Sequence, residues 1–338
     1  MKTVASDRHF NTILTSASVC AINRNQKYVY GNVSPILPVN NLSDNYASYD
    51  LDSWYRSQMQ KRAPGTSAAQ ADFSVNFDST YQCAQYALLV RIPDEVRRNA
   101  DSIFKIDKDY TDFLTMQMML FKEKMAANTY FKSGVWGTEY NGVAEKPGEN
   151  QFIQFNLADS KPIEFFSQVL DDMEEKTGGF RPNSITFPRR VFTAIKNNPE
   201  IADRIKYGTS TKAGAAYVTP EAIAALLEVD EVKVMSATEN IKAESGNKKT
   251  DAELKFINDD AVLIQYKANP ATNVAMATAC RTFQWTGLAG AKKGHRVLKY
   301  RDENTKRSDI IEIESCFVNE VTCKDMGVLL TNCLSKAA

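Results

Sequence analysis

The residues that could support acid–base or nucleophilic chemistry are few and widely spaced. Only two histidines occur among the 338 residues, His9 and His295. A nucleophile needs a base beside it, yet neither histidine accompanies a Gly-x-Ser-x-Gly elbow or a cysteine partner. We therefore expect both histidines to be either hydrogen-bonded or exposed to solvent, and we predict no catalytic residues.

Adjacent carboxylates occur in three places where a metal ion or an acid–base pair could be considered. They are Asp171-Asp172, Glu174-Glu175 and Asp259-Asp260. Neighbouring positions on a helix point in different directions, so such pairs do not converge on one ligand. Solvated surface is the favoured interpretation, and no metal site is predicted.

The six cysteines are scattered without a Cys-x-x-Cys pair. Zinc needs clustered thiolate or imidazole ligands, which argues against a structural zinc site. The scatter favours reduced, buried thiols, and a disulfide near the C-terminus is the weaker alternative. The cysteines are Cys20, Cys83, Cys280, Cys316, Cys323 and Cys333.

No motif for a cofactor is present. Gly178-Gly179 does not form a dinucleotide-binding loop, and the chain has no Gly-x-x-x-x-Gly-Lys-[Ser/Thr] loop. Four methionines between Met116 and Met125 are better explained by core packing than by a cofactor. The basic run Lys292–Arg296 could touch phosphate, but an exposed loop or a charge partner for another subunit is favoured. We predict no cofactor.

The composition limits the classes of function. Lys plus Arg and Asp plus Glu both number 41, so the formal net charge is zero. A protein dedicated to gripping nucleic acid normally has a basic surplus, which is missing here. Neutrality also removes some of the repulsion between copies, which weakly favours self-association. No secretory signal or membrane-length apolar run is found, so a protein soluble where it is made is expected.

The first 40 residues are polar with scattered hydrophobic side chains and predict an extended N-terminal arm. The stretch Pro35-Ile36-Leu37-Pro38 cannot form the interior of a helix, because proline lacks the amide donor and restricts the preceding residue. An extended arm that lies on something else and a simple edge strand fit this stretch equally well.

A long β-hairpin is predicted from about Tyr46 to Ile92. Apolar and polar residues alternate over Phe73–Phe77, the period of a strand with one covered face. The middle of the segment is small and polar and contains Pro64-Gly65, which marks a turn. Hairpins of this length rarely pack wholly on their own domain, so we expect this one to reach a partner.

The clearest helix is predicted from Asp107 to Phe131, where apolar residues recur at steps of three and four. A second helix is expected from Pro162 to Lys176, with proline in its first turn and Gly178 beyond its end. A near-continuous apolar run, Ala261–Ile264, predicts a central strand.

Between Arg181 and Asn240 the pattern indicates a strand, a helix, a break, a second helix and a second strand. The first strand is Ser184–Phe187, followed by a helix from Pro188. The Gly- and Ser-containing stretch Tyr207–Ala216 predicts a mobile loop. Thr219-Pro220-Glu221 then has the cap, the proline and the carboxylate of a helix start.

The last third of the chain is rich in strands. Residues alternate in polarity over Thr282–Thr286. Arg296–Tyr300 and Asp309–Glu314 flank a polar turn and predict a second hairpin. Together with the helices, these segments give an α+β fold class.

Several short motifs follow one another in a particular order along nearly the whole chain. They are Tyr81-Gln82-Cys83 with Tyr86-Ala87-Leu88, Pro182-Asn183, Asn198-Pro199-Glu200-Ile201, Asp203-Arg204-Ile205-Lys206-Tyr207, Val218-Thr219 and Phe283-Gln284-Trp285. Each motif alone is weak, but their order resembles the major capsid proteins of tailed bacteriophages, in the lambda-type head-protein branch.

The resemblance implies the fold first described for phage Hong Kong 97. That fold has an N-terminal arm, an extended hairpin called the E-loop, a peripheral domain with a spine helix, and an axial domain. In this numbering the resemblance implies an arm over 1–40, an E-loop over 41–95, a peripheral domain over 96–158 and 271–338, and an axial domain over 159–270.

The resemblance further implies a structural protein without catalysis, assembled as hexamers and pentamers into an icosahedral shell around double-stranded DNA. Its site would consist of contacts between subunits at the E-loop, the capsomer centre and the last hairpin turn. The residues expected there are Trp54, Tyr55, Lys61, Arg62, Pro64, Gly65, Tyr207, Gly208, Arg301, Asp302 and Glu303.

The implied partners are further copies of the chain, a portal, a decoration protein, and packaged DNA held by weak, non-specific contact. Relatives with an internal scaffold carry a charged helical segment before the arm. Here the arm begins almost at once, so a separate scaffolding protein is expected. Some relatives crosslink a lysine to an asparagine; Lys61 and Asn319 exist, but no such bond is predicted. The implied location is the virion, after assembly in the host bacterial cytoplasm.

Two other functions stay open at this point. An encapsulin-like bacterial compartment would keep the fold and enclose an enzyme instead of DNA. A two-domain α/β enzyme with an unrecognised site belongs to another class, and burial of both histidines beside carboxylates in one cleft would favour it.

Overall fold

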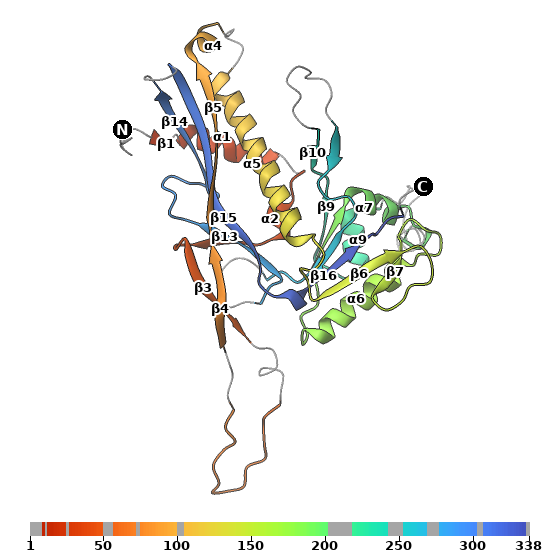
Figure 1. The fold of residues 1–338 in the computed structure, drawn as a ribbon. Coiled ribbons are helices and arrows are strands. Elements are labelled where there is room, and N and C mark those ends of the chain that lie inside the picture. The colour runs from red at the N-terminus through yellow and green to blue at the C-terminus, as the bar shows by residue number, and fades with distance from the viewer. Residues whose placement is uncertain are drawn as a thin grey trace, which may run out of the picture.

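Two six-stranded sheets form the body of the described part of the molecule, and one long helix connects them along the chain (Figure 1). The computed structural model describes residues 9–10, 12–24, 27–49, 57–71, 75–99, 105–201, 218–242, 253–268, 277–302 and 307–335. The expected loop Tyr207–Ala216 lies outside these residues.

The first sheet has the order β1-β14-β15-β13-β2, and β5 pairs with β15 as well. Its strands are β1 (His9–Phe10), β2 (Ile36–Val39), β5 (Ala84–Pro93), β13 (Cys280–Trp285), β14 (His295–Asp302) and β15 (Ser308–Val321). The register from His295↔Ser315 to Asp302↔Ser308 confirms the predicted second hairpin.

The predicted spine helix is confirmed as α5 (Ile106–Tyr130). Its buried stripe includes Leu114 and Met118, which pack with Leu14 of α1 and Ile311 and Ile313 of β15. Ala126, further along the same stripe, belongs to the larger core cluster. Asp107 lies in the first turn, where a carboxylate favours the helix dipole. Met118 and Met119 are core residues, as expected, and Met125 is half-buried. Met116 is 48% exposed, so the core-packing prediction is wrong for that residue.

The N-terminal region corrects one expectation. Instead of an extended arm alone, the structure contains a helix, α1 (Thr12–Arg24), packed on α5 and β14. The proline-flanked stretch forms β2, which pairs in parallel with β13 at the edge of the sheet, so the edge-strand alternative applies there. Between them, α2 (Tyr30–Val33) also contacts α5.

The second sheet has the order β7-β6-β16-β12-β8-β9. Its strands are β6 (Thr138–Val143), β7 (Gln151–Ile153), β8 (Ser184–Pro188), β9 (Glu231–Met235), β12 (Val262–Gln265) and β16 (Gly327–Thr331). Helices α6 (Pro162–Lys176), α7 (Arg189–Lys196) and α9 (Pro220–Leu226) belong to the same lobe, and η2 (Lys324–Met326) precedes β16. Strand β12 lies between β8 and β16 and is buried along its length, which confirms a central strand.

Local sequence signals explain where these helices start. Pro162 occupies the first turn of α6, and Pro188 immediately precedes α7. The Thr219 side chain accepts a hydrogen bond from the amide of Ala222 at 3.2 Å, so the predicted cap of α9 is confirmed. Gly142 permits a close approach of strands, since a Cβ there would lie 2.1 Å from the carbonyl oxygen of Asn332.

A small buried polar cluster ties α1 to α5 and β14. The Ser18 Oγ atom lies 2.6 Å from Thr115 Oγ1 and 3.0 Å from His295 Nε2. All three side chains are fully buried. Burial, followed by the positive charges of Lys122 and Lys293, lowers the pKa of His295 to about 4 from 6.5.

Because the folded protein holds His295 neutral, its contribution to stability is complete above pH 6.5 and is lost as the pH falls toward 4. We predict that His295→Gln removes the part of the pH dependence of the free energy of unfolding that His295 causes. Relative to the variant, the wild-type free energy of unfolding should fall by up to about 3 kcal/mol across that window. Urea unfolding at a series of pH values measures the difference, and a difference that does not change with pH contradicts the prediction.

Candidate assembly surfaces

The base of the E-loop hairpin is firmly attached to the first sheet. Strands β3 (Ser43–Tyr49) and β4 (Val75–Gln82) pair antiparallel from Ser43↔Gln82 to Tyr49↔Val75. Tyr81 stacks on Phe283 of β13 with ring centroids 4.4 Å apart, and Tyr46 contacts the same ring at 5.4 Å. Aromatic contacts of this kind contribute beyond simple area burial, so they fix the direction in which the hairpin leaves the body.

The hairpin is shorter than the sequence suggested. Its second strand ends at Gln82, and Ala84–Pro93 forms β5, which pairs with β15 from Phe317↔Ala84 to Ser308↔Pro93. An alternating or apolar pattern identifies a strand but not its partner. The residues after Gln82 are therefore a strand of the first sheet and not part of the β3–β4 pair. The E-loop boundaries of 41–95 remain a prediction.

Beyond the paired strands, the segment 57–71 extends far from the body (Figure 1). Nearly every residue in it is exposed, including Lys61, Arg62, Pro64 and Gly65. The hydrogen bonds within it are local: Arg62 Nε donates to the carbonyl of Thr66, and Thr66 Oγ1 donates to that of Ala63 at 2.9 Å. Gly65 has a φ of 85°, which suits glycine in the turn.

The segment 57–71 therefore makes no described contact that would stabilise its own subunit. It carries two positive charges, from Lys61 and Arg62, and no acidic residue. Met59 is 94% exposed. Holding a segment in one extended conformation costs conformational entropy, which contacts with another surface can offset. The segment 57–71 is therefore a candidate contact surface.

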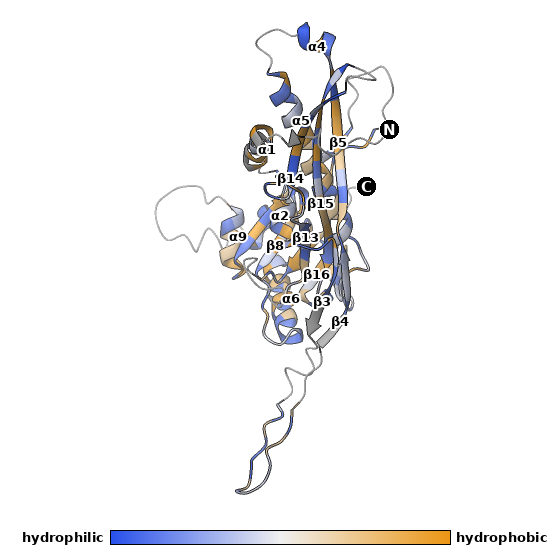
Figure 2. Ribbon diagram, turned by 90° about the vertical axis from the view of Figure 1, so that its left-hand side faces the viewer, coloured by the Kyte–Doolittle hydropathy of each residue, from blue (hydrophilic) through white to orange (hydrophobic). Residues whose placement is uncertain are grey.

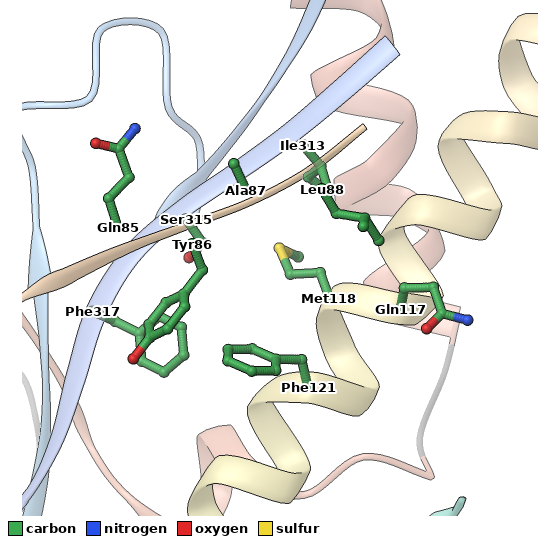
Figure 3. Close-up of a pocket in the computed structure, with 10 residues that line it drawn as sticks. All are labelled: Gln85, Tyr86, Ala87, Leu88, Gln117, Met118, Phe121, Ile313, Ser315 and Phe317. Carbon is green, nitrogen blue, oxygen red and sulfur yellow. The ribbon is translucent and has the colours of Figure 1, made fainter. Parts of the chain in front are cut away.

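A groove opens between β5, β15 and α5 (Figure 3). Its volume is about 450 Å³. Tyr86, Phe121 and Phe317 face one another in it, with ring centroids 4.8 Å apart for Tyr86–Phe121 and 5.2 Å for Tyr86–Phe317. Phe121 is 37% exposed, so the aromatic cluster is open to a partner. We call this the aromatic groove.

Strand β5 borders the aromatic groove and forms an edge of the sheet. Among the described strands it pairs only with β15, and Figure 2 colours much of it hydrophobic. Leu88 and Leu89 are 46% and 41% exposed. A long apolar edge strand is a ready template for contact with another chain.

The sequence interpretation missed both the groove and the edge. The apolar run Tyr86–Val90 was a usable signal for the exposed edge. A strand with one solvated face normally alternates apolar and polar residues, so a continuous apolar run indicates that both faces are covered, in part by another chain. The groove itself joins residues about 200 positions apart, such as Phe121 and Phe317. Local patterns do not contain that distance.

Arg301 and Asp302 lie at the end of β14 and take part in ion pairs within the chain. Arg301 binds both carboxylate oxygens of Asp94, at 3.0 and 2.7 Å, and reaches Asp309 at 3.1 Å. The hydrogen bond from Arg301 lowers the pKa of Asp94 from its ordinary value. Asp302 pairs with Arg91 at 2.8 Å. Their expected role between subunits stays a prediction.

The predicted contact residues are therefore not gathered in one place. Lys61, Arg62, Pro64 and Gly65 lie on the extended segment, whereas Arg301 and Asp302 lie at the opposite end of the molecule beside α4 (Asp94–Arg98) (Figure 1). The other predicted contact residues, Trp54, Tyr55, Tyr207, Gly208 and Glu303, lie outside the described residues.

The chemistry available to a substrate is limited. Ser18 and His295 form a serine–histidine pair, but both are fully buried, so solvent does not reach them. Within the described ranges, no group of three or more His, Cys, Asp or Glu side chains could hold a metal ion. In the same residues, no helix is both long and apolar enough to span a bilayer.

The described cysteines are also chemically quiet. The free thiols are Cys83, Cys280, Cys316, Cys323 and Cys333. Burial raises the pKa of Cys83 to about 11 and that of Cys280 to about 12. Because the thiolate is the reactive form, these groups behave as small core side chains.

Comparison with known proteins identifies the fold. No family model and no curated protein matches this chain. A phage-related protein from Bordetella bronchiseptica RB50 is 20% identical, with 98% of this chain and 99% of that chain covered and a TM-score of 0.71. The capsid structure of cyanophage P-SCSP1u is 9% identical, covers 99% and 93%, and has a TM-score of 0.56.

An encapsulin is also among the similar structures. The structure of the holo-SrpI encapsulin complex from Synechococcus elongatus PCC 7942 is 10% identical, covers 91% of this chain and 88% of that one, and has a TM-score of 0.51. The chain thus has the α+β fold of Hong Kong 97-like capsid structures, which confirms the predicted fold class.

We predict that residues 58–70 can be replaced by a Gly/Ser segment of equal length without destabilising the unassembled subunit. No described contact of this stretch reaches the body, so the free energy of unfolding should change by less than about 0.5 kcal/mol. Denaturant unfolding of the dissociated subunit measures it. A loss of several kcal/mol would mean that the segment folds against its own body.

Proposed function

We propose that this chain is the major capsid protein of a tailed bacteriophage, a structural subunit that assembles as hexamers and pentamers into an icosahedral shell around double-stranded DNA. The observation that carries the proposal is the extended segment 57–71, which is exposed in a subunit whose fold is similar to that of capsid structures. A second copy provides the surface that such a segment lacks on its own chain.

In this proposal the contacts between copies divide among several surfaces. The extended segment, with Lys61 and Arg62, lies over a neighbouring subunit. The aromatic groove and the exposed edge of β5 supply apolar area to the same lattice. Each contact is modest, and its repetition around a closed shell gives collective stability.

The remaining expected contacts complete the arrangement. Tyr207 and Gly208 belong to the loop that would line the capsomer centre, formed by the axial domain over 159–270. Arg301, Asp302 and Glu303 would sit near contacts between capsomers, where the ion pairs of Arg301 hold the hairpin end in one conformation.

The proposed partners follow from the same assembly. A separate scaffolding protein, a portal and a decoration protein would act with the shell, which forms in the bacterial cytoplasm and ends in the virion. Equal numbers of acidic and basic residues, 41 each, fit weak and non-specific contact with DNA.

An encapsulin-like compartment is the second candidate, because the same fold occurs in the encapsulin complex from Synechococcus elongatus. The two candidates differ in content. Particles purified from the native source contain nuclease-protected DNA under the first proposal and an enzyme under the second.

The proposal predicts that the purified chain forms shells, tubes or capsomers. Sedimentation velocity and cryo-electron microscopy provide the measurement, with and without a scaffolding protein from the same source. The Gly/Ser variant of residues 58–70 should keep its fold and lose particles, because only contacts between copies are removed. A wild-type monomer at high concentration under every condition of salt and scaffold contradicts the proposal.

The exposed edge gives a second assembly test. We predict that Leu88→Asp reduces particle yield at least tenfold, since a carboxylate at an apolar contact between subunits is not compensated. Leu88→Ile is the matched control and should assemble normally, because it keeps an apolar, strand-compatible side chain. Circular dichroism of both variants shows whether the subunit is folded. Normal particles from Leu88→Asp would show that the exposed edge of β5 is not a contact between subunits.

A further inference from the structure

A second cavity lies beside α5, between the end of α1, the α2 region, β9 and the turn before β14. Its volume is about 480 Å³. Three lysines line it, Lys122 of α5, Lys233 of β9 and Lys293 of the turn, together with the tyrosines Tyr28 and Tyr30. No carboxylate is among the residues that line it. We call it the lysine cavity.

Lys122 is the unusual member of this set. It is only 5% exposed, and among the described residues it forms no ion pair. Its ammonium instead lies 5.8 Å from the ring centre of Tyr30 and 5.1 Å from that of Phe317. Buried charges in proteins are normally paired with an opposite charge. Lys122 departs from this rule, because two aromatic rings surround its ammonium and no described carboxylate pairs with it.

The positive charge in this region affects the pKa of a neighbouring histidine. Lys122 and Lys293 both lower the pKa of His295, after the larger effect of burial. Burial also lowers the pKa of Lys122 to about 8. An anion in the cavity would relieve both effects, because it would stabilise the charged form of the lysine.

Two carboxylates, Glu123 and Glu231, lie close to the walls of the cavity and bond to residues that line it. Glu123 Oε2 accepts hydrogen bonds from the amides of Val29 and Tyr30 at 2.9 and 2.8 Å. Glu231 pairs with Lys267, and it also approaches Lys233 at 3.5 Å. Glu123 and Glu231 therefore border the cavity without lining it. After the larger effect of burial, the negative charge of Glu123 raises the pKa of Tyr28 and of Tyr30.

We propose that the lysine cavity binds a phosphate group. A phosphate offers several oxygens and more than one negative charge to three separate ammonium groups, whereas a carboxylate offers one charge. Lysine binds phosphate as a point charge, and the tyrosine hydroxyls can complete the contacts. The source is either a free phosphate compound or the backbone of a nucleic acid. All the residues that line the cavity belong to one subunit, so binding does not require shell assembly.

The test is a calorimetric titration of the full chain with pyrophosphate. The wild type should bind in a saturable manner, with Lys122→Met lowering the affinity at least tenfold. Lys108→Met is the matched control, because Lys108 is an exposed lysine of the same helix that does not line the cavity. Affinity for the wild type should also fall as the pH rises from 7 to 9.5, since Lys122 loses its proton in that range.

A short DNA duplex in place of pyrophosphate distinguishes the two sources. If Lys122→Met weakens binding of both ligands, the cavity accepts a backbone phosphate; if it weakens pyrophosphate alone, the ligand is a free phosphate compound. Both results support the site. Absence of saturable pyrophosphate binding overturns it, as does equal affinity in the wild type and Lys122→Met, or equal weakening by Lys108→Met.

A folding defect in Lys122→Met would not end the test. Lys293 is exposed and Lys233 is half-buried, so their alanine variants are expected to fold. Each should weaken pyrophosphate binding at least threefold. Unchanged affinity in both variants overturns the proposal.

Discussion

Strand β15 is the constraint on which the rest of the structure depends. Over Ser308–Ser315 it pairs with β14 on one edge and β5 on the other, and over Phe317–Val321 it pairs with β13. Most of its residues are buried, so both of its faces are covered. The two buried carboxylates on it are matched, Glu312 by Tyr300 Oη at 2.7 Å and Glu314 by Arg296 Nε at 2.6 Å. Without these partners, the carboxylates would oppose burial of the strand.

β15 occupies one edge of β5, and no other described strand pairs with the opposite edge. The same pairing places Tyr86 of β5 beside Phe317 of β15 and so forms one wall of the aromatic groove. It also ends the β3–β4 hairpin at Gln82, whereas the extended segment 57–71 lies beyond the opposite end of that hairpin, where Tyr49 pairs with Val75. The exposed surfaces thus follow from one fully used central strand, without any catalytic arrangement.

The sequence predicted those parts whose partners are close in the chain. The period of Leu114, Met118 and their neighbours was sufficient for α5, and the polar turn between β14 and β15 was sufficient for their hairpin. Caps and prolines located α6, α7 and α9 to within a residue or two. In each case the determining interaction lies within a few residues.

The failures have the opposite character. Helix α1 has the sequence TILTSASVCAINR, rich in residues that favour helices poorly. Its inner face is partly polar: Thr15 Oγ1 accepts a hydrogen bond from the amide of Val297, and Ser18 contacts Thr115. Tertiary hydrogen bonds therefore stabilise a helix that shows little apolar periodicity. The pairing of β5 with β15 was hidden for the same reason, since its partner lies more than 200 residues away.

The lysine cavity lies between these two cases, because one local signal was present. Leu114, Met118, Lys122 and Ala126 follow one another at steps of four on a single helix face, so Lys122 interrupts a buried stripe. Lowering its pKa from 10.5 to about 8 corresponds to about 3 kcal/mol of destabilisation of the charged form. Methionine would fill this position without that cost and would pack against the same rings. For packing alone the lysine is therefore the worse choice, which is why the cavity it lines is better explained by an anion than by the core.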